Sequence, residues 1–255
     1  MKMPDIMEML KAGIHFGHQT SRRHPKMEEY IFTTRNGVNV IDLEKTKTQL
    51  ESVLSEIKSL AAQGKVILFI GTKSQARQFV GDAARKCGMP YLTERWIGGL
   101  LTNFSEVKNR LKKYKELKEE FASGEIEKYT KKEIVSLKKK LEKMDKYLAG
   151  LVDLEKMPDV LYVASLHNEK TAIKETQRTG TPIIAVCDTN SNPTKADYII
   201  PANDDAVNSI KMIVDLVAEA VIEGKQELEA NKPKEEKRNI IPKKPERRVI
   251  QEESV

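Results

Sequence analysis

The sequence predicts an α/β fold, a three-layer sandwich in which helices cover both faces of a parallel sheet, with a helical hairpin inserted into it. Apolar runs such as residues 66–71 and 159–164 do not alternate with polar residues, which is typical of strands buried on both faces. Segments with helical periodicity lie between these runs, so strands and helices alternate along the chain. A heptad pattern between residues 134 and 151 predicts the hairpin.

Local signals define the individual elements. Asp5 and Glu8 form a capping box that opens a short helix, which ends near Gly13. Asn36-Gly37 stands between two strand-like segments and is a strong signal for a β-hairpin. After this first helix, the N-terminal part is predicted to hold hairpin strands at 30–34 and 38–41 and a helix from about residue 50 that Gly64 closes. Strands at 66–71 and 89–92 follow, with a helix at 76–87 between them. After the insertion come strands at 159–164 and 182–187 with a helix at 168–178 between them, then a strand at 198–201 and a long helix at 205–224.

The insertion, residues 103–151, is predicted to be an antiparallel coiled-coil arm. Its first half carries an apolar helical stripe, and Ser123-Gly124 separates this stripe from the second half. There, Thr130 and Glu133 form a capping box, and the apolar residues follow a spacing of three and four. The arm holds 14 lysines and arginines against 9 aspartates and glutamates, a net charge of +5. The seam of the second half consists of Ile134, Leu137, Leu141, Met144, Leu148 and Leu151.

The chain has 255 residues, which suits one large domain with an insertion. Its last part combines prolines and charges with few apolar anchors, which is typical of a flexible basic tail. We expect residues 1–102 to form an N-terminal extension and the first half of the α/β core, residues 103–151 the coiled-coil insertion, residues 152–230 the second half of the core, and residues 231–255 the tail.

Charge is distributed unevenly along the chain. The net charge is +6 and the pI is about 9.0. Residues 152–230 hold 7 lysines and arginines against 14 aspartates and glutamates, a net charge of −7, so the remainder carries +13. Such a division predicts that one part of the protein meets an anionic partner and the other does not.

Composition also excludes several classes of protein. Cys87 and Cys187 are far apart and both follow apolar stretches, so we expect free buried thiols. The first ten residues lack the apolar core of a signal peptide, and no apolar run reaches the length of a membrane span. We therefore expect a cytoplasmic protein without a membrane partner.

The basic stretch GIHFGHQTSRRHPK, residues 13–26, is the most unusual segment and is predicted to be a loop. His15 and His18 have the spacing His-x-x-His, but no cysteine is near and Gly17 opposes a helix that would orient both rings. Histidines that form hydrogen bonds are favoured over a metal site. His15 and His18 stay weak metal candidates, and we expect no cofactor.

An enzyme is the second hypothesis. Residues 71–74, Gly-Thr-Lys-Ser, follow a strand as a phosphate loop does, but the upstream glycine and the spacer are missing. Asp188, Asp204 and Asp205 fall at the carboxyl ends of predicted strands, where enzymes often place carboxylates. Helix caps and turns explain these aspartates as well. Because no set of nucleophile, base and orienting residue is visible, we expect no enzyme.

Nucleic-acid binding is the third hypothesis and the one the residues favour. Arg22, Arg23, Lys26 and Arg35 cluster near aromatic and histidine residues, a combination that binds phosphates and stacks on unpaired bases. Arg95-Trp96 offers a second such pair, although Trp96, the only tryptophan, fits an ordinary core position equally well. A protein-only adaptor that docks through the arm is the remaining alternative.

Four blocks of the sequence resemble one known family, the bacterial small-subunit ribosomal protein two family. The resemblance covers nearly everything from residue 7 to residue 223. The blocks are LKAGIHFGHQTSRRHPK at 10–26, YIFTTRNGVNVIDLEKT at 30–46, MPYLTERWIGGLLTNF at 89–104 and TPIIAVCDTNSNPTKADYIIPANDD at 181–205.

This resemblance implies a flavodoxin-like sandwich with a protruding coiled coil, and a protein that is not an enzyme. It implies a structural constituent of the small ribosomal subunit that binds small-subunit ribosomal RNA between head and body, joins late in assembly and helps dock ribosomal protein one. The expected partners are this RNA and neighbouring ribosomal proteins, with no DNA. The predicted RNA-binding residues are His18, Gln19, Thr20, Arg22, Arg23, Lys26, Arg35, Arg95, Trp96, Lys108, Arg110, Lys112 and Lys113.

Overall fold

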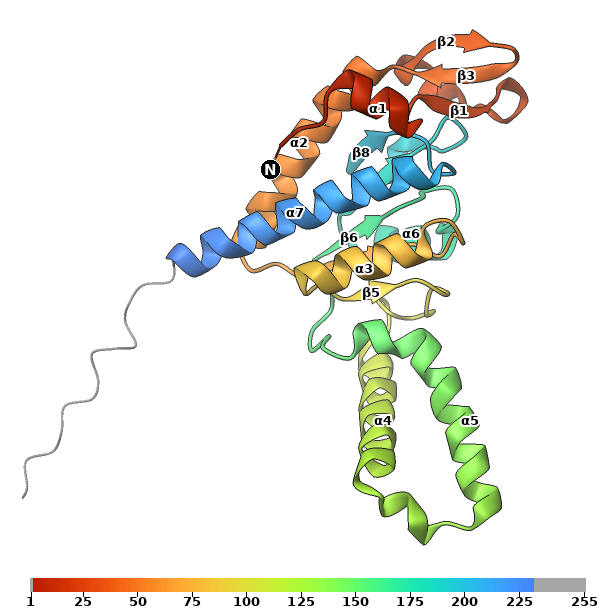
Figure 1. The fold of residues 1–255 in the computed structure, drawn as a ribbon, viewed down its shortest axis with the longest axis vertical. Coiled ribbons are helices and arrows are strands. Elements are labelled where there is room, and N and C mark those ends of the chain that lie inside the picture. Colours follow the sequence, from red (N-terminus) through yellow and green to blue (C-terminus); the bar gives the residue numbers. More distant parts are fainter. Residues whose placement is uncertain (1, 232–255) are drawn as a thin grey trace, which may run out of the picture.

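The structure, a computed structural model, describes residues 2–231 and has three parts (Figure 1). An α/β sandwich forms the body. A three-stranded N-terminal unit, residues 16–41, lies at one end of the body, and the helical arm, residues 103–151, projects from the other. Except for Asn231, which ends the last helix, the predicted tail at 231–255 lies outside the described residues.

The body is built on the predicted parallel sheet. Five strands lie in the order β5-β4-β6-β7-β8, and every neighbouring pair is parallel. The arm follows the edge strand β5, whereas the opposite edge strand β8 lies toward the N-terminal unit (Figure 1). The strands are β4 Ile67–Ile70, β5 Tyr91–Leu92, β6 Val160–Val163, β7 Ile183–Cys187 and β8 Tyr198–Pro201.

Two apolar cores, one on each face, hold the sandwich together. Successive strand residues point to opposite faces, so Phe69 and Tyr162 enter one core while Leu68 and Leu161 enter the other. Burial on both faces explains why the strands read as continuous apolar runs. The first core packs against α1 Ile6–Ala12, α2 Leu43–Ala62, α3 Arg77–Cys87 and α7 Val207–Asn231; the second packs against α6 Lys170–Thr179 and the base of the arm.

The last helix is longer than the sequence predicted. Gly224 was expected to end it, but α7 continues to Asn231. The glycine serves close packing instead: a Cβ atom at Gly224 would lie 2.3 Å from the carbonyl oxygen of Lys58 and 2.7 Å from Cβ of Ala61 in α2. Helices α2 and α7 therefore approach each other at a point where only glycine fits.

The N-terminal unit corrects the prediction of a loop at residues 13–26. Part of this stretch is strand β1 Phe16–Gln19, which pairs with β3 Val38–Ile41. The predicted hairpin is confirmed: β3 pairs antiparallel with β2 Ile31–Arg35, and Asn36 and Gly37 both have positive φ. The short 3₁₀ helices η1 Thr20–Arg22 and η2 Pro25–Tyr30 carry the rest of the basic stretch.

The arm consists of two helices, α4 Phe104–Ser123 and α5 Lys131–Leu148, joined by the 3₁₀ helix η3 Glu125–Lys128 (Figure 1). At its base Val107, Leu111, Tyr114 and Leu148 are buried, and the Tyr114 hydroxyl donates to the Asp145 carboxylate. The other α5 seam residues, Ile134, Leu137, Leu141 and Met144, are only half-buried. Coiled-coil packing along the full arm therefore stays a prediction.

Within residues 2–231, no helix combines the length and the apolar character that a membrane crossing requires. Cys87 and Cys187 are free and buried, as predicted.

Candidate nucleic-acid interface

The N-terminal unit exposes four of the nine lysines and arginines predicted to bind RNA. Among the described residues, Arg22 and Arg35 form no ion pair. Arg23 lies 3.7 Å from the Glu28 carboxylate, an exposed and therefore weak pair. Six of the predicted residues lie at the surface of this unit: Gln19, Thr20, Arg22, Arg23, Lys26 and Arg35.

Hydrogen bonds to Thr189, which follows β7, fasten the unit to the body. The backbone N–H of His18 donates to Oγ1 of Thr189 at 2.8 Å, and the N–H of His24 donates to the Thr189 carbonyl at 2.8 Å. Gly17 makes this contact possible, because a Cβ atom there would lie 2.5 Å from the Thr189 methyl group. The side chain of buried Asn39 donates to the His18 carbonyl at 2.9 Å and joins β3 to the same point.

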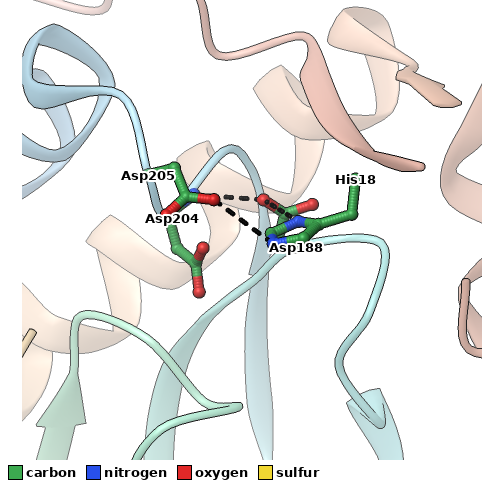
Figure 2. Close-up of side chains that lie close together, drawn as sticks. All are labelled: His18, Asp188, Asp204 and Asp205. Atoms are coloured by element: carbon green, nitrogen blue, oxygen red, sulfur yellow. Dashed lines mark hydrogen bonds and ion pairs between the residues drawn. The ribbon is translucent and has the colours of Figure 1, made fainter. Parts of the chain in front are cut away.

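His18 itself points inward, toward the carboxyl end of the sheet (Figure 2). Its Nδ1 lies 3.1 Å from the Asp188 carboxylate and its Nε2 lies 3.2 Å from that of Asp205. Both ring nitrogens therefore face acceptors, which favours the doubly protonated imidazolium. The hydrogen bond with Asp188 raises the pKa of His18; burial opposes this, and the charges of the neighbouring aspartates add to it.

Lys73 supplies a positive charge at this edge. Its ammonium group lies 2.8 Å from the carboxylate of Asp204 and 2.6 Å from that of Asp205. Burial lowers the pKa of Lys73, but the hydrogen bonds with these carboxylates outweigh it and the pKa is raised. Burial and the charge of Asp188 raise the pKa of Asp204, which also accepts from Ser165 at 2.6 Å.

The same edge contains the one group of residues, within the described part of the chain, that could hold a metal ion. His18, Asp188, Asp204 and Asp205 each place a ligand atom within 4.8 Å of the others. His15, the other weak metal candidate, is not part of this group; its Nδ1 is buried without a hydrogen-bond partner, and burial lowers its pKa. Of the two weak metal candidates, only His18 lies in this group.

Residues 71–74 do not form a cradle for phosphate. The backbone N–H and the hydroxyl of Thr72 donate to the Glu169 carboxylate at 3.2 and 2.5 Å. Lys73 is committed to the aspartates. The polar groups that an enzyme would direct at a nucleotide are thus engaged inside the protein.

The second predicted pair, Arg95-Trp96, is divided between surface and core. Arg95 is exposed and forms no ion pair among the described residues, but Trp96 is only 7% exposed and belongs to the second core. Its indole N–H donates to the Glu175 carboxylate at 2.9 Å. Trp96 therefore positions its neighbour and does not present an open stacking face.

The predicted cations of the arm lie along the exposed side of α4. Lys108 and Lys113 have no ion-pair partner among residues 2–231. Arg110 lies 3.4 Å from the Glu106 carboxylate, and Lys112 lies 3.7 Å from that of Glu116. Both are pairs between exposed residues within one helix and hold these cations only weakly.

Sequence reasoning missed how these residues combine. Asp188, Asp204 and Asp205 were recognised as strand-end carboxylates, but not as partners of His18 or Lys73. Glu175 was missed altogether, although a carboxylate among the buried residues Ala172, Ile173 and Thr176 of α6 is the signal that could have revealed it.

These features define a class: an α/β sandwich protein whose free cations lie on projections, while the carboxylates at the edge of its sheet are neutralised internally. Residues 9–224 match the family described as ribosomal protein S2. The chain belongs to the ribosomal protein S2 family, which confirms the resemblance seen in the sequence.

One similar protein is the small ribosomal subunit protein uS2 of Coprothermobacter proteolyticus. It is 45% identical over 226 residues, which cover 89% of this chain and 84% of that protein. The chain is accordingly a structural, non-enzymatic ribosomal protein of the small subunit with a role in translation.

Proposed function

We propose that the protein binds small-subunit ribosomal RNA between the head and the body of the subunit, through the N-terminal unit and the arm. In this role it supports late assembly in the cytoplasm and helps dock ribosomal protein one. The observation that carries the proposal is the contrast between free and neutralised charges. Arg22, Arg35 and Arg95 are exposed cations without ion pairs among the described residues, whereas Asp204 and Asp205 are paired with Lys73.

Phosphate contacts supply most of the affinity in this proposal, so binding should depend strongly on salt. If six to ten phosphates are contacted, affinity should fall by about 10³ to 10⁵ between 50 and 200 mM salt, by analogy with duplex DNA. A flat response to salt would argue against the proposal.

The decisive experiment is co-sedimentation with small subunits that lack this protein, with and without ribonuclease. We expect the double variant Arg22→Ala, Arg23→Ala to associate at least tenfold more weakly while its melting temperature is unchanged. The control is Lys170→Ala, Lys174→Ala, which removes two exposed cations from α6 in the acidic half of the chain. Equal weakening by both double variants, or association that survives ribonuclease, would favour the protein-only adaptor instead.

A further inference from the structure

A cavity lies where the arm joins the body. It has a volume of about 430 Å³, within the range of small-ligand sites. One wall is the segment 95–98, which follows β5; the other walls come from α4 and α5. The residues that matter for its chemistry are Arg95, Ile97, Arg110, Lys143, Met144 and Tyr147.

Every charged residue in the lining is a cation. Arg95 and Lys143 are exposed and have no ion-pair partner within residues 2–231. Within residues 2–231 the only ion-pair partner of Arg110 is Glu106, at 3.4 Å in a pair that is more than half exposed on both sides. A ligand with negative charge would meet three available cations and no carboxylate.

The interior of the cavity is apolar and includes an aromatic ring. Ile97, Met144 and Tyr147 are half-buried, so each offers part of its surface. Flat apolar surface beside guanidinium groups is the combination that holds an unpaired base by stacking and its phosphates by charge. A base in a duplex is already stacked and paired, and cannot enter such a cavity.

We propose that this cavity binds one or two unpaired nucleotides of single-stranded RNA, an inference that rests on the proposed function. The base lies against Met144 and Tyr147, and the flanking phosphates contact Arg95, Arg110 and Lys143.

The wall that carries Arg95 is fixed in advance. Glu175 accepts from the indole N–H of Trp96 at 2.9 Å and from the backbone N–H of Gly99 at 2.8 Å, on either side of residues 97 and 98. A wall fixed before binding loses little conformational freedom when the ligand arrives. Gly98 completes the wall, and a Cβ atom added to it would meet no atom within 4 Å.

The open space at Gly98 allows a blocking variant that leaves every charge in place. Gly98→Leu should fill the cavity without disturbing the fold, because Gly98 does not need a positive φ. The complementary variant, Arg95→Ala with Lys143→Ala, removes two cations and leaves the volume. The matched control is Lys138→Ala, an exposed lysine of α5 outside the cavity.

The test measures binding of a fluorescent six-nucleotide single-stranded RNA of mixed sequence by anisotropy at low salt. We expect Gly98→Leu and Arg95→Ala/Lys143→Ala each to weaken binding at least tenfold and Lys138→Ala less than twofold, with unchanged melting temperatures. With 4-thiouridine in the RNA, photocrosslinks should fall on Met144 or Tyr147. A duplex of the same length should not compete.

Three results would overturn the inference: full affinity in Gly98→Leu, crosslinks that all lie outside the cavity, or tighter binding of an acidic peptide than of the RNA in competition. Failure of the proposed function looks different. In that case the unaltered protein does not associate with subunits through RNA at all, whereas failure of this inference alone leaves that association intact in both cavity variants.

Discussion

Replacing Glu175 with glutamine should destabilise the protein far more than the same change at Glu169. Both glutamates are buried and lie near the start or middle of α6, but their surroundings differ. Burial raises the pKa of Glu175, yet hydrogen bonds from Trp96 and three backbone N–H groups outweigh it and leave the pKa lowered. At Glu169 burial prevails over the hydrogen bonds from Thr72, and the pKa is raised.

The magnitude follows from the donors around Glu175. One oxygen accepts from Trp96 and Gly99; the other accepts from Leu101 at 3.2 Å and from the N–H and hydroxyl of Thr102 at 3.4 and 3.3 Å. Glutamine keeps the first oxygen but places an NH₂ group opposite the second set of donors. The buried N–H of Leu101 then lacks an acceptor, at a cost of about 1–3 kcal/mol, and Thr102, an exposed residue, loses its acceptor at a smaller cost, so we expect a total loss of about 3 kcal/mol.

Glu169→Gln should cost less than about 1 kcal/mol. Among the described residues its accepting oxygen serves only Thr72, and an amide oxygen can replace it. The dependence on pH gives an independent check. The lowered pKa of Glu175 means that its contribution is present above the unfolded value of about 4.5 and is lost as pH falls through the folded value. The pKa of Glu169 is raised, so its contribution to stability is present below the unfolded value of about 4.5 and is lost as pH rises through the folded value.

The assay is urea unfolding followed by far-UV circular dichroism, with hydrogen exchange at the amides of Gly99, Leu101 and Thr102. A loss of about 3 kcal/mol corresponds to a fall of roughly 6–12 °C in melting temperature for a protein of this size. The fluorescence of Trp96, the only tryptophan, reports the same site directly. Equal costs for the two variants, or unchanged exchange at these amides, would refute the reasoning.

Two further predictions concern packing and pH. Gly224→Ala should destabilise the protein by about 1–3 kcal/mol in urea unfolding, because its Cβ would lie 2.3 Å from the Lys58 carbonyl oxygen. The control, Gly98→Ala, should cost almost nothing, because its Cβ would meet no atom within 4 Å. Similar costs for both variants would show that α2 and α7 separate freely. His18→Gln should cost about 1.5–3 kcal/mol at pH 6, since the pKa of His18 is raised chiefly by its hydrogen bond with Asp188. That cost is complete below pH about 6.5 and should shrink as pH rises through the folded pKa, so a cost that grows with pH would contradict the ion pairs.

The sequence predicted the sandwich well because its strands are buried on both faces. A continuous apolar run such as residues 66–71 has few other interpretations, and the glycines after helices have the positive φ that ends them. Strand β1 was missed because its residues, Phe16 to Gln19, lack apolar periodicity, and its pairing with β3 and its contact with Thr189 decide its conformation. Gly224 was misread because a helix end and a close helix contact both require glycine.

The candidate interface was predicted in composition but not in arrangement. Exposed cations such as Arg22 and Arg35 can be predicted from the sequence, because their exposure does not depend on contacts with residues far away in the chain. The contacts of His18 with Asp188 and Asp205 join residues far apart in the chain, so local patterns contain no trace of them. Trp96 shows the same limit, because a tryptophan beside an arginine is equally typical of a core and of a stacking surface.

The bond between His18 and Thr189 also constrains how the protein can be made. These residues are 171 positions apart, so the basic end of the chain leaves the ribosome long before its anchor exists. At about 5–20 residues per second, translation delays the anchor by roughly 10–30 s. During that interval the nascent chain exposes Arg22 and Arg23 before the sheet that positions them has formed. Any RNA bound in that interval would be bound by an incompletely synthesised chain.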